Sequence, residues 1–245
     1  MMASDSRNPS GADLHKNHRK RLFARYDRDG FDSFEEHNIL ELLLFYSITR
    51  ADTNPTAHNL INRFGSLYGV LTAPEEELKR VKGIGPTSAR LLHEVFDCVR
   101  SASVRKICER PVDNYDRLQR LASEWMAGRE TGTSALILFG VDMRVLDIVP
   151  LASGHVITPF SYTDTILELA NKRKSASVVL MHNHPDADLH PSAADRCMTA
   201  DIYRALAAQG IRLMEHLVVH EFDTLPILDI SLGEECSAFP RNYLK

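Results

Sequence analysis

Apolar residues in the first hundred positions recur every three to four residues, the spacing that buries one face of an α-helix. No stretch before about residue 130 alternates apolar and polar residues as a half-buried β-strand would. We therefore predict an all-helical N-terminal part. Its expected helices cover residues 14–28, a run that includes 39–45, a segment from 53 to 64, a segment opening at 74–80, and one through 89–96.

Local signals place the ends of two of these helices. Ser33 followed by Glu36 forms a capping-box pattern before the apolar run 39–45. Pro55 suits the first turn of the next helix, and Gly65 can end it in the left-handed conformation. The first of the helices, 14–28, carries six basic residues and a single acid, so it is amphipathic with a basic face.

The pattern of apolar positions changes after residue 111. Short apolar runs now alternate with helical segments, which indicates helices packed on a sheet. Ser161 with Asp164 predicts the start of one helix, and Ser192 to Gln209 forms another that Gly210 ends. Strands are expected at 134–141, 144–151, 178–181 and 212–220.

The predicted fold class is therefore α+β, an all-α domain followed by a mixed α/β domain. The expected boundaries are a disordered tail at 1–14, a helical domain at 15–104, the mixed domain at 110–233 and a C-terminal tail at 234–245.

Composition narrows the classes of function. The chain has 245 residues and a net charge of −4, so any contact with nucleic acid must use a local basic patch. No window approaches the roughly 18 apolar residues of a membrane span, and the N-terminus lacks the apolar core of a secretory signal. We expect a cytoplasmic protein without a membrane partner. The four cysteines form no C-x-x-C pair, which argues against a thiolate zinc finger.

The strongest chemical signal is a pair of histidines, His182 and His184, at the end of the predicted strand 178–181. Alternate strand residues point to one side, so both imidazoles can face the same point. Asp195 falls in the first turn of the next helix, where the chain can return to the strand end. Two imidazoles and one carboxylate leave a fourth position open, the arrangement of a catalytic zinc site.

Simpler interpretations of the same residues exist. Ser192 and Asp195 also satisfy a capping box, and one carboxylate oxygen can bind a metal while the other accepts hydrogen bonds. A lone H-x-H pair is more often not a metal site. His190, which lies in the intervening loop, is expected to be a surface histidine.

The full string, H-x-H followed by seven residues and S-x-x-D, resembles the motif of the JAMM (MPN, JAB) metalloprotease-like domains. Pro185 and Pro191 look like the RadC branch of that family, and Glu215-His216 stands where the branch has a D-H pair. The N-terminal half adds two segments that look like RadC helix-hairpin-helix segments, at 64–71 and 82–85.

The resemblance implies a zinc hydrolase acting on a protein or peptide, with a link to DNA repair. It implies that His182, His184 and Asp195 bind zinc, and that Ser192 hydrogen-bonds the attacking water or an oxyanion. Such hydrolases also use a glutamate as general base on an earlier strand. Ungapped matching puts Ser134 at that position.

Three other acids are weighed as the missing base. Glu130 is four residues upstream of Ser134, roughly 13 Å along a strand, and a shifted register could present it. Glu168 is expected at the surface, and Glu215 near the site but outside the ligand set.

The segment Lys82-Gly83-Ile84-Gly85 fits the hairpin of a helix-hairpin-helix. Lys82, Gly83 and Gly85 would then let backbone N–H groups approach a DNA phosphate, without sequence preference. The alternative is that the glycines only turn the chain and pack Ile84 into the core. Two hypotheses follow: a zinc-dependent hydrolase, or a nucleic-acid-associated accessory protein whose enzyme-like domain is degenerate.

Overall fold

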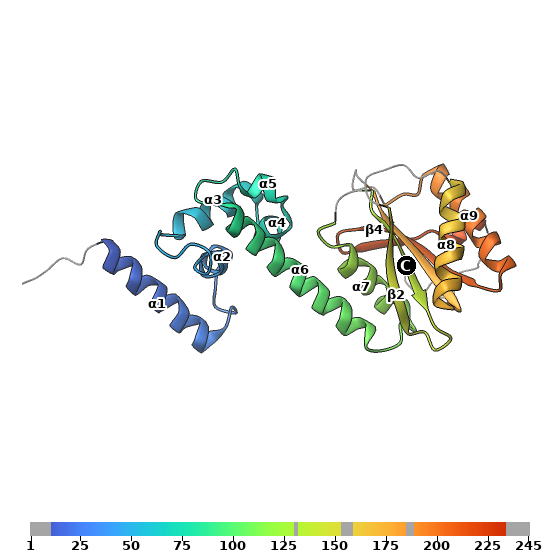
Figure 1. Cartoon of the computed structure of the whole chain (residues 1–245), viewed down its shortest axis with the longest axis horizontal. Helices are drawn as coiled ribbons and strands as arrows, with labels where there is room; N and C mark the ends of the chain where they lie inside the picture. The colour runs from blue at the N-terminus through green and yellow to red at the C-terminus, as the bar shows by residue number, and fades with distance from the viewer. Residues whose placement is uncertain (1–10, 130–131, 153–158, 185–188, 234–245) are drawn as a thin grey trace, which may run out of the picture. The chain divides into compact units, whose positions relative to one another are not determined.

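The computed structural model describes residues 11–129, 132–152, 159–184 and 189–233 (Figure 1). The chain divides into two compact units, Met1–Val99 and Arg100–Lys245. The predicted order of a helical region followed by a mixed sheet region is confirmed. Both predicted tails fall mostly outside the described residues, but the first helix already begins at Gly11. No helix in the described ranges is long and apolar enough to cross a membrane.

The N-terminal unit is built from short helices around one apolar core. The core is formed by fully buried leucines from successive helices, among them Leu40, Leu60, Leu78 and Leu92. The helices are α1 (Gly11–Asp29), α2 (Glu36–Leu44), α3 (Asn54–Phe64), α4 (Leu67–Thr72), α5 (Glu75–Leu78) and α6 (Pro86–Cys108), whose last turns belong to the second unit.

The basic helix α1 packs on the rest of its unit through Leu22, which is buried against Leu42 and Phe45. One of its basic residues has a structural task, since Arg19 donates hydrogen bonds to the backbone carbonyls of Ile48 and Ala51. Part of the predicted basic face therefore holds α1 in place.

Two predicted helix starts are wrong. The N-cap of α2 is Glu35, which makes no capping hydrogen bond with its side chain. Ser33 lies two residues before this N-cap, and its hydroxyl accepts a hydrogen bond from Arg25 instead. Helix α8 begins at Pro159, which places Ser161 inside the helix.

The second unit contains a five-stranded sheet in the order β2-β1-β3-β4-β5, in which only β3 and β4 are parallel among the described pairs. Strand β4 has its predicted bounds, and the other three predicted strands shift by at most a few residues. The elements are α7 (Tyr115–Met126), β1 (Ser134–Phe139), β2 (Val145–Ala152), α8 (Pro159–Arg173), β3 (Ser177–Asn183), α9 (Ala193–Ala208), β4 (Arg212–His220), β5 (Asp223–Pro226) and α10 (Leu228–Leu232).

Helices cover both faces of this sheet, α8 and α9 on one side and α7 on the other (Figure 1). Alternation along β1 supplies both cores, with Leu136 and Leu138 towards α8 and α9, and Ile137 and Phe139 towards α7. Because both faces are buried, β1 reads as a continuous apolar run.

Candidate metal centre

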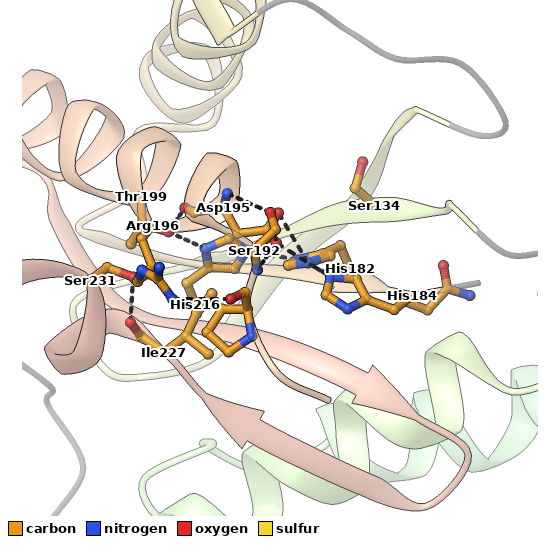
Figure 2. Close-up of polar contacts among 12 residues, drawn as sticks. Ser134, His182, His184, Ser192, Asp195, Arg196, Thr199, His216, Ile227 and Ser231 are labelled. Carbon is orange, nitrogen blue, oxygen red and sulfur yellow. Dashed lines mark hydrogen bonds and ion pairs between the residues drawn. The ribbon is translucent and has the colours of Figure 1, made fainter. Parts of the chain in front are cut away.

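The two histidines of the motif lie at the end of β3, on the sheet face covered by α9. Leu180 packs in the core beneath α8 and α9, and the strand alternation carries His182 and His184 to that same side. Helix α9 begins nine residues after His184 and brings Asp195 to them in its first turn (Figure 2). One nitrogen or oxygen from each of these three residues lies within 4.8 Å of the others.

The separations suit a small tetrahedral cation. The two Nε2 atoms of His182 and His184 are 2.9 Å apart. His182 Nε2 lies 3.5 Å from Asp195 Oδ1, and His184 Nε2 lies 3.4 Å from Asp195 Oδ2. Zinc bonds of about 2.0–2.1 Å imply a distance between neighbouring ligand atoms of about 3.3 Å. The donor set and its spacing therefore fit zinc, and three protein ligands would leave one tetrahedral position for another ligand.

Helix capping positions the carboxylate. Ser192 is the N-cap of α9, and its hydroxyl and backbone N–H both donate to Asp195 Oδ2, at 2.6 Å and 2.7 Å. Oδ1 makes neither of these bonds and is free to face a metal. Burial opposes ionisation of the Asp195 carboxyl, but the Ser192 hydrogen bonds and the two histidines outweigh it and lower its pKa. The predicted capping box is confirmed, and it leaves the carboxylate charged.

The hydroxyl proton of Ser192 is directed to Asp195 in this arrangement. The role predicted for Ser192 towards an attacking water or an oxyanion is not tested by this contact and stays a prediction. The geometry does show that Ser192 orients the Asp195 carboxylate.

A fully buried histidine lies directly behind His182. His216 Nε2 is 2.8 Å from His182 Nδ1, and His216 Nδ1 is 2.6 Å from the Thr199 hydroxyl (Figure 2). The backbone of His216 is fixed on both sides, since its carbonyl accepts from Ile227 N–H and its N–H donates to Glu215. His216 therefore has little freedom to turn away.

His182 and His216 are both neutral at pH 7. Burial, opposed by Asp195 and reinforced by His184, lowers the pKa of His182 from 6.5 to about 4. Burial also brings the pKa of His216 well below 6.5, and the neighbouring His182 and His184 act in the same direction. Neutral imidazoles offer the lone pair that a metal requires.

These shifts predict how the stability of the metal-free protein depends on pH. The unfolded chain takes up a proton at His182 near pH 6.5, whereas the folded chain resists protonation down to about pH 4. The free energy of unfolding should thus be highest above pH 6.5 and fall by up to about 3 kcal/mol as the pH approaches 4. Urea titrations across this range measure it. A His182→Asn variant should lose less stability, and an equally steep fall in that variant would contradict the assignment.

Ser134 occupies the strand position directly opposite His182, since the two residues pair in the antiparallel ladder of β1 and β3. Its hydroxyl contacts the phenol of Tyr162 on α8. Figure 2 shows that this hydroxyl points away from the histidines. Ser134 therefore borders the site without contributing an acid or a base to it.

The other acids weighed as a general base have different places. Glu130 lies outside the described residues. Glu168 is exposed on α8. Glu215 is buried, and its carboxylate accepts from the backbone N–H groups of His216 and Leu228. Within the described ranges, the cluster of possible metal ligands thus contains no carboxylate other than Asp195.

The predicted hairpin residues belong to the N-terminal unit, whereas His182, His184 and Asp195 belong to the second unit. Lys82, Gly83 and Gly85 are exposed between α5 and α6, and Ile84 is buried in the core of that unit. Gly83 has φ +97°, and a Cβ there would lie 2.6 Å from the Thr56 hydroxyl. The turn that the glycines were expected to make is present.

The sequence did not indicate the contacts of Thr199 and His216. Glu215-His216 matches the position of the D-H pair of the RadC branch, but the sequence assigns His216 no contact. His216 reaches His182 because of the β3–β4 register, and Thr199 reaches His216 because α9 crosses that strand. A helix hydroxyl four residues after Asp195, on the same helix face, was the one available signal.

Comparisons with known proteins agree with this architecture. Residues 112–228 match the model of the RadC-like JAB domain. A UPF0758 protein of Ruegeria pomeroyi is 34% identical over 209 residues, which cover 83% of this chain and 92% of the relative. A UPF0758 protein of Burkholderia mallei is 32% identical over 213 residues, which cover 84% of this chain and 73% of the relative. The chain, with its helical first unit and a JAB-type sheet bearing the His-His-Asp cluster, therefore belongs to the RadC family.

Proposed function

We propose that the second unit is a zinc-dependent hydrolase domain that cleaves an amide bond in a peptide or protein. The observation that carries this proposal is the convergence of His182, His184 and Asp195 at separations of 2.9–3.5 Å, with the pKa of His182 lowered so that its ring is neutral at pH 7. The three ligand side chains are 13–19% exposed, so a substrate can reach them.

Zinc bound by these residues supplies Lewis acidity towards a carbonyl oxygen and lowers the pKa of water. The residues of the chain hold and orient that ion. His182 and His184 present nitrogen lone pairs, and Asp195 presents Oδ1 while Ser192 holds Oδ2. The negative charge of the Asp195 carboxylate and its fixed orientation would stabilise a cation at this partly buried site.

The proton acceptor in this proposal is Glu130. It is the nearest acid upstream of Ser134, the position at which related hydrolases carry their glutamate. The Ser134 hydroxyl cannot take this role at neutral pH, because an alcohol is far too weak a base. Glu130→Gln should keep zinc binding and remove cleavage.

The test uses the full chain loaded with one equivalent of zinc and a mixture of fluorogenic peptides. The wild type should cleave a peptide, the His182→Ala variant should lose both zinc and cleavage, and Glu130→Gln should lose cleavage alone. Stoichiometric zinc without cleavage of any peptide would contradict the hydrolase and favour the degenerate accessory protein.

A second candidate function, contact with DNA, is supported by the loop between α5 and α6. Lys82 and Gly85 are exposed there, and nothing lies within 4 Å of where a Gly85 Cβ would stand. A phosphate could approach the backbone at such a site. Binding of a duplex oligonucleotide should weaken with salt and with Lys82→Glu. The control is Arg204→Glu on α9, which should bind DNA as the wild type does. If Lys82→Glu binds DNA as strongly as this control, the loop is not the DNA contact.

A further inference from the structure

The hydrogen bonds behind His182 have a defined direction, which begins at Thr199. The Thr199 hydroxyl is 2.6 Å from the backbone carbonyl of Asp195, and a carbonyl can only accept. Thr199 has one proton, and this contact uses it. Towards His216 Nδ1, which is also 2.6 Å away, the Thr199 oxygen must therefore act as an acceptor.

The direction then passes through two imidazole rings. His216 Nδ1 must carry a proton in order to donate to Thr199. A neutral imidazole has one such proton, so His216 Nε2 carries a lone pair. His182 Nδ1 lies 2.8 Å from His216 Nε2 and must donate a hydrogen bond to its lone pair. The proton of His182 is then on Nδ1, and its Nε2 lone pair faces His184 and Asp195.

We propose that Thr199 and His216 are positioning residues that fix the tautomer of His182, so that its Nε2 is always available to a metal ion. Neither residue contacts the ion. The chain of hydrogen bonds runs from a carbonyl of α9 through the Thr199 hydroxyl and the His216 ring, both fully buried, to the half-buried ring of His182. Reversing it would take the Thr199 proton away from the Asp195 carbonyl, and a hydrogen bond of this kind contributes about 0.5–1.5 kcal/mol.

This arrangement also connects the two elements that carry the ligands. Thr199 and Asp195 lie on α9, whereas His182 lies at the end of β3 and His216 on β4. The same helical turn that delivers the carboxylate ligand therefore sets the protonation site of the first histidine ligand. The expected effect on zinc affinity rests on the proposed function. The tautomer of His182 follows from the hydrogen bonds alone.

The experiment uses the metal-free full chain labelled with ¹⁵N-histidine at about pH 7.5, where imidazole is ordinarily neutral. Long-range ¹⁵N–¹H correlation spectra distinguish a proton on Nδ1 from one on Nε2, and loss of a signal in His182→Asn assigns the residue. The wild type should show His182 with its proton on Nδ1.

The isosteric variant Thr199→Val removes the acceptor for His216 Nδ1. His216 should then carry its proton on Nε2 and donate to His182 Nδ1, which moves the His182 proton to Nε2. Zinc affinity, measured by competition with a chromophoric chelator, should fall on the order of 10-fold. Thr199→Ser keeps the hydroxyl and should keep both the tautomer and the affinity.

The outcomes separate this inference from the proposed function. A wild-type His182 with its proton on Nε2, or an unchanged tautomer and affinity in Thr199→Val, would overturn the inference even if zinc binds well. The predicted tautomers in a protein that takes up no zinc would support the inference and contradict the proposed function.

Discussion

Zinc affinity should fall roughly 100-fold or more when His182 is replaced by alanine. Structural zinc sites with four protein ligands contribute roughly 10–16 kcal/mol, so each ligand accounts for roughly 3 kcal/mol, or ~100-fold in affinity. His182 is also the residue that joins the metal cluster to His216, so its loss removes a ligand and the support behind it. Competition titration with a chelator measures the change.

The matched control is His190→Ala. His190 is exposed in the same loop that leads from β3 to α9, and it is not part of the cluster. Its replacement should leave zinc affinity unchanged. A loss of affinity in His190→Ala as large as that in His182→Ala would mean that another set of ligands holds the ion. Thermal unfolding of both metal-free variants checks that each is folded.

Replacing Gly83 by alanine should destabilise the N-terminal unit by about 2–5 kcal/mol. An L-residue at φ +97° costs about 1–2 kcal/mol, and the added methyl group would lie 2.6 Å from the Thr56 hydroxyl, which adds a packing cost of about 1–3 kcal/mol. Thr56 is itself buried, so it has little room to move. Urea unfolding of the full chain measures the loss.

Gly85→Ala is the control, because no heavy atom beyond its two neighbours in the chain lies within 4 Å of its Cβ position. This variant should change stability by less than about 1 kcal/mol. Adding Thr56→Ala to Gly83→Ala should recover part of the loss, because the clashing hydroxyl is gone. Equal effects of the two glycine variants would contradict the account of why Gly83 is a glycine.

The motif residues could be predicted because their signals are local. The Ser192–Asp195 capping box, the alternation that puts His182 and His184 on one face, and the bounds of β4 all depend on residues close together in sequence. Helix α7 could also have been predicted from local signals. It has Asn114 as N-cap and apolar residues at three- and four-residue spacing, yet it was not predicted.

Other features depend on contacts that sequence patterns do not encode. The N-cap of α2 is Glu35 and not Ser33, whose hydroxyl is hydrogen-bonded to Arg25 on α1. The contact between His182 and His216 depends on the register between β3 and β4, which contains a bulge after Val178. The short β5 and α10 have too few residues to show a period.

The central claim is that two imidazoles and one carboxylate of this chain hold a zinc ion. X-ray absorption at the zinc edge of the full chain, loaded with one equivalent of zinc, tests it most directly. The account predicts a four-coordinate ion with nitrogen and oxygen neighbours at about 2.0–2.1 Å and the outer-shell scattering of two imidazoles. Sulfur neighbours at about 2.3 Å, or a spectrum without imidazole scattering, would contradict it.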